Sequence, residues 1–122
     1  MDNEIKRYTV IIFTENQTGL LTQISNIFTR RNLDIWSLSA IPTEIPGIHS
    51  ITIQTDGIEK KLREASLQIQ NRVDVVRSYY FVSDQIINRE IIMYRMALEE
   101  VKNFLAERTE LKAQVLATPE ED

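Results

Sequence analysis

The sequence predicts an α+β fold in which two helices cover one face of a four-stranded antiparallel sheet. Three observations predict it. Runs rich in β-branched and aromatic residues alternate with runs of helical apolar spacing in the order β-α-β-β-α-β. That order, within about 80 residues, is the ferredoxin-like split βαβ arrangement. The composition, 43% hydrophobic and 26% charged, is that of a folded globular protein rather than a disordered chain.

The first strand and the first helix are expected near the N-terminus. Tyr8–Phe13 is an unbroken β-branched and aromatic run, and the polar stretch Thr14–Gly19 follows it as a turn. Thr18 is the expected N-cap of the next helix, and Asn32 is expected to end that helix in the left-handed conformation. Four apolar residues at helical spacing define the buried face of the helix: Leu20, Ile24, Ile27 and Phe28.

A hairpin, a second helix and a fourth strand follow. Asp34–Ile41 and Ile48–Thr55 are the expected hairpin strands, joined by a loop that contains prolines and a glycine. Asp56 is expected to open the second helix, with Glu59 three residues later completing a capping box. The fourth strand is expected at Val73–Val82. The apolar residues of the second helix recur at helical spacing: Ile58, Leu62, Ala65 and Ile69.

The first strand carries apolar side chains on both of its faces. Successive side chains of a strand point to opposite sides, so Tyr8, Val10 and Ile12 face one way and Ile11 and Phe13 the other. The helices cover only one face of the sheet. We therefore expect another chain or the C-terminal segment to cover part of the second face or a sheet edge.

The remainder of the chain predicts the start of a second unit. Residues 1–83 are expected to form the first domain, and residues 84–122 an incomplete second α+β domain. Within the latter, Ile91–Leu98 is expected as a strand and Glu99–Arg108 as a helix. Leu111–Ala117 fits either another strand or a continuation of the helix. The acidic C-terminal end is expected to be frayed.

The composition narrows the function. A net charge of -4 and a pI near 5.1 argue against a nucleic-acid partner, because phosphate binding depends on clustered Lys and Arg. There are no cysteines, and the single histidine, His49, has no second histidine with which to share a metal. No glycine spacing fits a phosphate loop. The N-terminus has no signal-peptide pattern, and no apolar run is long enough to cross a membrane, so a cytoplasmic protein is expected. These observations favour a non-catalytic protein without metal or cofactor.

One turn has the chemistry of a binding site. The segment from Glu15 to Leu20 joins a strand to a helix whose first amides are unpaired and electropositive, so a carboxylate can dock there. Gly19 lets a ligand approach the backbone closely. The alternative interpretation is an ordinary strand-to-helix turn capped by Thr18.

Several motifs together resemble one family. The Glu-Asn-x-x-Gly-x-Leu turn that begins at Glu15 resembles the ligand turn of ACT domains in general. The Val-Asp-Val-Val stretch at residues 73–76 and the Arg-Glu-Ile stretch at residues 89–91 are similar to the small subunit of acetohydroxyacid (acetolactate) synthase in particular. The resemblance covers roughly residues 5 to 118.

The resemblance implies a regulatory subunit without thiamine diphosphate. Such a subunit activates a separate catalytic subunit and mediates feedback inhibition by valine or another branched-chain amino acid. In the family the amino acid lies between two ACT domains, near the first strand-to-helix turn of one and the second strand of the other, so a homodimer is implied. By position, the effector-binding residues are Asn16, Gln17, Thr18, Gly19, Leu20, Asp34 and Ile35. Asn16 is expected to hydrogen-bond the ligand, and backbone amides to take a carboxylate.

Two departures from the family pattern affect these expectations. Where the family has an asparagine before the second strand, this chain has Asp34, which can accept from a ligand ammonium but repels a carboxylate. Weak or altered amino-acid binding is therefore expected. The chain also ends about halfway through the second domain of the family. A stand-alone ACT amino-acid sensor or dimerisation module remains the alternative function.

Overall fold

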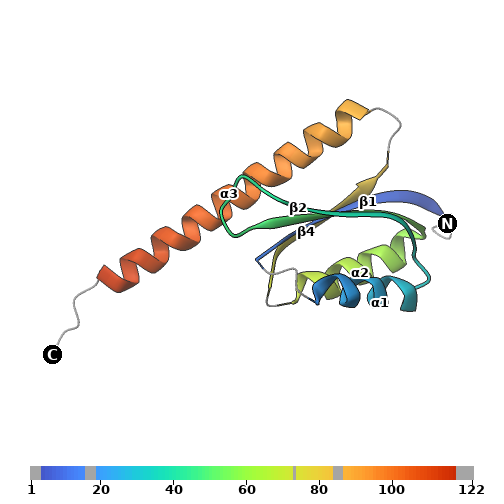
Figure 1. Ribbon diagram of the computed structural model, residues 1–122, viewed down its shortest axis with the longest axis horizontal. Helices are drawn as coiled ribbons and strands as arrows, with labels where there is room; N and C mark the ends of the chain where they lie inside the picture. The colour runs from blue at the N-terminus through green and yellow to red at the C-terminus, as the bar shows by residue number, and fades with distance from the viewer. Residues whose placement is uncertain (1–3, 16–18, 73, 84–86, 118–122) are drawn as a thin grey trace.

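The computed structural model has a single four-stranded sheet with two helices on one face and a long helix on the other (Figure 1). It describes residues 4–15, 19–72, 74–83 and 87–117, with side chains from 91 to 108 in the last segment. All strand pairs are antiparallel, in the order β2-β3-β1-β4. The predicted fold class is confirmed. The elements are β1 Lys6–Thr14, α1 Leu20–Arg30, β2 Asp34–Pro42, β3 His49–Gly57, α2 Glu59–Gln70, β4 Val75–Val82 and α3 Ile87–Ala117.

The main core lies between the sheet and the pair α1 and α2. Tyr8, Val10 and Ile12 of β1 point into it, as the alternation of the strand predicts. The apolar faces predicted for both helices are the buried ones, and only Ile58 lies outside the helix to which it was assigned. The helical residues of this core are Leu20, Ile24, Ile27 and Phe28 of α1 and Leu62, Ala65 and Ile69 of α2.

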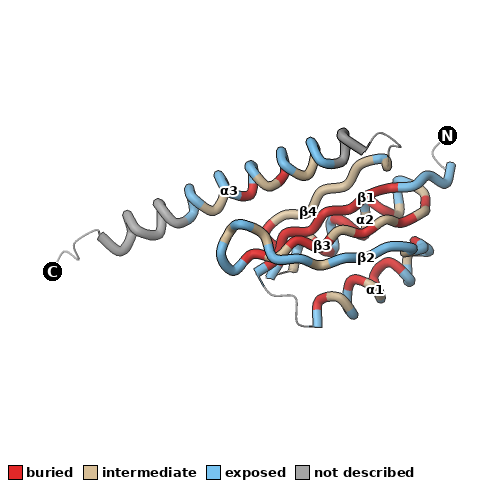
Figure 2. Tube along the Cα trace, turned by 45° about the horizontal axis from the view of Figure 1, so that its top comes forward, coloured by how far each residue is buried: buried red, intermediate tan, exposed pale blue. Residues whose placement is uncertain are grey.

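A second, smaller core lies on the opposite face of the sheet. Ile11 and Phe13 of β1 contact Ala97 and Val101 of α3 there. Figure 2 shows α3 running along the side of the sheet that α1 and α2 leave uncovered. The hydroxyls of Ser50 and Tyr94 lie 3.2 Å apart and hydrogen-bond α3 to β3. The expectation that the C-terminal segment covers part of this face is confirmed.

The prediction of a strand at Ile91–Leu98 is wrong, because these residues belong to α3, a helix of 31 residues. A continuous apolar run does not distinguish a strand from a buried helix. Contact with the sheet decides it, since the sheet-facing residues recur every three or four positions. Leu111–Ala117 continues this helix. The residues of α3 that pack on the sheet are Tyr94, Ala97, Leu98, Val101, Phe104 and Leu105.

The caps expected for both helices are also wrong. The capping position of α1 is Gly19 rather than Thr18, which lies outside the described residues. Asp56 belongs to β3, and Ile58 occupies the capping position of α2. The expected left-handed residue after α1 is confirmed, since Asn32 has φ 58°.

Asp56 lies in β3 because the ladder between β1 and β3 continues through it to Gly57. The Oδ1 atom of Asp56 lies 2.9 Å from Nε of Arg7, which is opposite it in β1. The hydrogen bond from Arg7 lowers the pKa of the Asp56 carboxyl. The Arg7 guanidinium also lies 4.1 Å from the centre of the Trp36 ring. Both charged groups are largely solvated, so this pair orients the strand ends rather than contributing much stability.

Among the helices that the structure describes, none has the length and apolarity required to span a membrane.

Candidate effector-binding site

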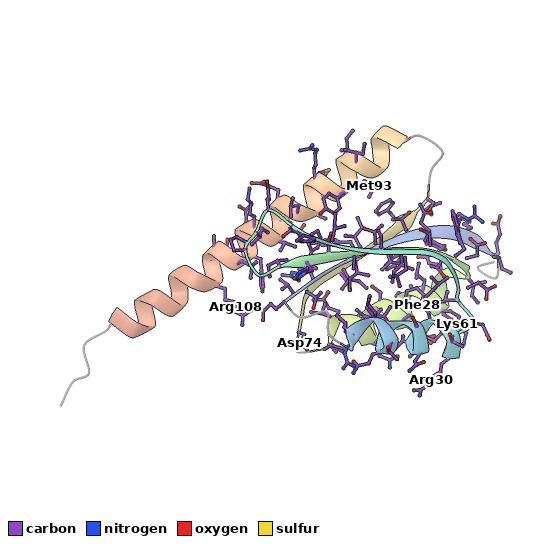
Figure 3. All side chains as sticks on the ribbon, in the orientation of Figure 1. Phe28, Arg30, Lys61, Asp74, Met93 and Arg108 are labelled. Carbon is purple, nitrogen blue, oxygen red and sulfur yellow. The ribbon has the colours of Figure 1, made fainter. Side chains whose placement is uncertain are left out.

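The turn between β1 and α1 is anchored on one side. The Glu15 amide and the Thr14 hydroxyl both donate to the carbonyl of Asp74, at 2.9 and 2.8 Å. Figure 3 labels Asp74 in the segment before β4. Gly19 then occupies the capping position before α1 with φ 76°, a left-handed conformation that residues other than glycine rarely adopt. Asn16, Gln17 and Thr18, three of the predicted effector-binding residues, lie outside the described residues.

Among the described residues, no side chain hydrogen-bonds to the N-terminus of α1. The first helical hydrogen bond runs from the Gln23 amide to the Gly19 carbonyl, at 3.3 Å. No side chain of the described residues caps the amides before it. A Cβ built on Gly19 would meet nothing within 4 Å, so there is space beside the backbone. Leu20 is buried in the core, and only its backbone can take part in binding. Amides in this position suit a carboxylate.

Asp34 and Ile35 lie in a second place, at the start of β2. Asp34 is exposed and Ile35 is half-buried against the main core. The hydroxyl of Thr55 donates to the Asp34 carbonyl at 2.8 Å and holds this end of the strand. A groove of about 580 Å³ runs from here along α1. It is lined by Ser25, Thr29, Asn32, Leu33, Asp34, Ile35 and Leu38.

The two groups of predicted residues do not meet within one chain. Gly19 and Leu20 lie at the start of α1, whereas Asp34 follows its end. Figure 1 shows α1 spanning the sheet between these two places. A helix of 11 residues rises about 16 Å, which is longer than a single amino-acid ligand. One protomer therefore presents the predicted binding residues in two separate groups, which we name half-sites.

Next to both half-sites lies the open edge of β2. This strand is at the margin of the sheet and, within the part of the chain that the structure describes, pairs only with β3. Trp36, Leu38 and Ile41 are exposed along it, Trp36 by 50%. The sequence predicted this strand but not that its edge would be free. The polar positions Ser25 and Thr29 of the groove were missed as well, although their i, i+4 spacing places them on one face of α1.

His49 lies in β3 opposite Thr14 and Pro42 and is half-buried, with its Nδ1 unpaired among the described residues. Within the same residues, no group of three or more His, Asp or Glu side chains is placed to hold a metal ion.

Comparisons with known proteins identify the family. The profile described as "AHAS small subunit-like ACT domain" matches residues 10–77. The acetolactate synthase small subunit of Buchnera aphidicola subsp. Schizaphis graminum is 30% identical over 91 residues, covering 75% of this chain and 58% of that protein. The isozyme 3 small subunit of Escherichia coli is 33% identical over 85 residues, covering 70% and 52%.

Among solved structures, the acetolactate synthase small subunit from Thermotoga maritima matches with a TM-score of 0.54 and 24% identity. The match covers 68% of this chain and 50% of that one. This likeness supports the fold. The chain thus spans about half of the length of the relatives that it matches. From its profile match and its relatives, the chain belongs to the AHAS small subunit-like ACT domain family.

Proposed function

We propose that this chain is a non-catalytic regulatory subunit of acetohydroxyacid (acetolactate) synthase that binds a branched-chain amino acid between two copies of itself. The supporting observation is the separation of the half-sites at opposite ends of α1, beside an open strand edge. A single copy leaves each half incomplete. The names of the relatives support the choice of holoenzyme.

Pairing of two β2 edges would complete the site. Antiparallel pairing about a twofold axis reverses the second copy, so that the Asp34 end of one chain lies beside the Gly19 end of the other. The exposed Leu38 and Ile41 would then be buried at the junction. Pro42 ends β2 without opposing this arrangement, since proline is tolerated in an edge strand. Each dimer would hold two equivalent sites.

The two half-sites have complementary charge for an α-amino acid. The amides at the start of α1 suit the ligand carboxylate, and the Asp34 carboxylate of the other copy suits the ligand ammonium. Discrimination among valine, leucine and isoleucine by one or two methylenes is worth only about 1–3 kcal/mol, so overlapping effectors are expected.

Reconstitution tests the proposal. The chain is mixed with a purified acetolactate synthase catalytic subunit, and acetolactate formation is measured with and without valine, leucine and isoleucine. We expect a higher rate with the chain present and a decrease on adding an effector. By reciprocity, the catalytic subunit should change effector affinity by the same factor, roughly 5–150-fold. An unchanged rate would instead favour a stand-alone amino-acid sensor or a dimerisation module, and pull-down from a native extract would then recover no catalytic subunit.

The variant Asp34→Asn tests the proposal that Asp34 binds the ammonium group of the ligand. Loss of a charge-assisted hydrogen bond is expected to weaken amino-acid binding about tenfold, measured by calorimetric titration. Glu59→Gln is the control, because Glu59 is an exposed carboxylate at the start of α2. Equal affinities for the native chain and Asp34→Asn would exclude the role of Asp34. Tighter binding by the variant would mean that the ligand carboxylate, and not its ammonium, lies beside residue 34.

A further inference from the structure

The sheet has a second open edge, formed by β4. Of the strands in the described residues, β4 pairs only with β1. The Ser83 amide donates to the Arg7 carbonyl at 2.8 Å, so the backbone of Ser83 points toward β1. In an antiparallel pair, every second residue has this orientation. Odd-numbered residues of β4 therefore bond to β1. The backbone groups of Val76, Ser78, Tyr80 and Val82 point outward, away from the sheet.

Gln70 of α2 covers the first part of this edge. Its Nε2 donates to the Val76 carbonyl at 3.3 Å, and its Oε1 accepts from the Ser78 amide at 2.6 Å. The side-chain amide thus takes the place of a neighbouring strand. The remaining outward groups are the Ser78 carbonyl and the amides and carbonyls of Tyr80 and Val82. Among the residues that the structure describes, none hydrogen-bonds to them. Unpaired donors and acceptors at strand spacing are a template for another strand.

The uncovered part of the edge lies in a cleft between two helices. Ser66 of α2 is on one side, and α3 is on the other, where Met93 points toward β4 (Figure 3). The cleft has a volume of about 410 Å³. Its lining is mostly apolar, apart from two serines, the tyrosine hydroxyls and Glu100. Met96 of this lining is 67% exposed, and Val82, at the end of β4, is exposed as well.

We propose that the β4 edge binds an extended segment of a partner protein, which adds a fifth strand to the sheet at Ser78–Val82. This binding surface lies on the opposite edge from β2 and does not depend on the proposed effector site. Backbone hydrogen bonds would supply affinity, and alternate side chains would lie against α2 and α3. The α3 side favours apolar residues and one basic residue facing Glu100.

The shape of the cleft argues for a free extended segment rather than a second β4. In this chain β4 has helices on both of its faces, and such an edge is too thick to enter a cleft that itself lies between two helices. A small apolar ligand would leave the Tyr80 amide and carbonyl unpaired. The wall of the cleft also includes the Tyr79 hydroxyl, which has no hydrogen-bond partner among the described residues. Burial raises the pKa of Tyr79 to about 12, with Glu100 acting in the same direction, so this hydroxyl remains a donor at neutral pH.

A peptide titration tests the proposal. The probe is a peptide of about seven residues with blocked ends, alternating valine and threonine around one lysine. The full chain is labelled with ¹⁵N, and amide shifts and hydrogen exchange are followed by NMR. We expect the Tyr80 and Val82 amides to shift and to become protected from exchange. The same peptide with the residue next to the lysine replaced by proline, which lacks the amide for strand pairing, should bind about tenfold more weakly.

Two variants of the chain separate strand addition from simple apolar binding. Val82→Pro removes an outward amide without breaking the ladder to β1, and should weaken binding about tenfold. Val82→Thr keeps the amide and loses only apolar contact, so it should weaken binding by clearly less than Val82→Pro does. Gln70→Ala uncovers Val76 and Ser78, so it should strengthen peptide binding or cause self-association through a longer free edge. Protection of the β1 amides confirms that each variant is folded.

Three results would overturn the proposal. The first is a set of shifts that leaves the β4 amides unchanged. The second is equal binding by Val82→Pro and the native chain, because the outward amide would then play no part. The third is equal weakening in Val82→Pro and Val82→Thr, which would identify an apolar groove that recognises side chains only.

Discussion

Replacing Phe28 with alanine is expected to lower the free energy of unfolding by about 3–5 kcal/mol. The Phe28 side chain is 0% exposed and lies between α1 and the sheet, in contact with the main core (Figure 3). Alanine leaves a cavity there that neighbouring strand residues cannot fill, because the sheet holds them in place. Domains of this size have about 5–15 kcal/mol of stability in total, so most of it can be lost. Chemical denaturation followed by circular dichroism measures the change.

The matched control for this variant is Ile5→Ala, since Ile5 is 71% exposed before β1. Its effect should stay within about 0.5 kcal/mol. A similar loss in both variants would mean that the measured change does not come from core packing. A loss below about 1 kcal/mol for Phe28→Ala would contradict the packing of α1 on the sheet.

Replacing Val101 with aspartate is expected to release α3 from the sheet. Val101 is 0% exposed and contacts the second core beside Ile11 and Phe13. An unpaired carboxylate in that place should cost about 3 kcal/mol or more at neutral pH, and less in acid as it becomes protonated. The main core does not include α3, so α1, α2 and the sheet should remain folded. Hydrogen exchange should show loss of protection in α3 but not in β1.

Asn103→Asp is the control for the charge itself. Asn103 is an exposed residue of the same helix, so its replacement adds the same charge without burying it. Protection of α3 should then be unchanged. Cooperative unfolding of the whole chain in Val101→Asp would contradict the independence of the main core from α3.

The two proposed binding surfaces use opposite edges of one sheet. β2 and β4 are separated by β3 and β1, so a partner on one edge leaves the other accessible. A second copy at β2 and an extended segment at β4 can therefore be bound at once. Coupling between them would have to pass through the β1 and β3 ladders, which both edges share.

Local patterns in the sequence predicted most of the fold. The apolar spacing of α1 and α2, the alternation of β1 and the left-handed Asn32 all follow from residues close together in the chain, and the structure confirms them. The same kind of reasoning failed at Asp56 and at Ile91–Leu98. Asp56 remains in β3 because that strand is paired there with β1, opposite Arg7, 49 residues away. Ile91–Leu98 is helical because one of its faces meets a sheet formed by earlier residues.

The candidate sites divide in the same way. The chemistry of a helix start made the turn at Gly19 a candidate binding site, whereas Asp34 became a candidate through its position in the resemblance to the family. Only the tertiary structure placed them at opposite ends of α1 and left the β2 edge open between them. Likewise, only the packing of α2 against β4 brings Gln70 onto the Val76–Ser78 part of the β4 edge, beyond which no described residue pairs with it. Periodicity reports the preferences of neighbouring residues, whereas the pairing of edges and the position of half-sites depend on contacts between distant segments.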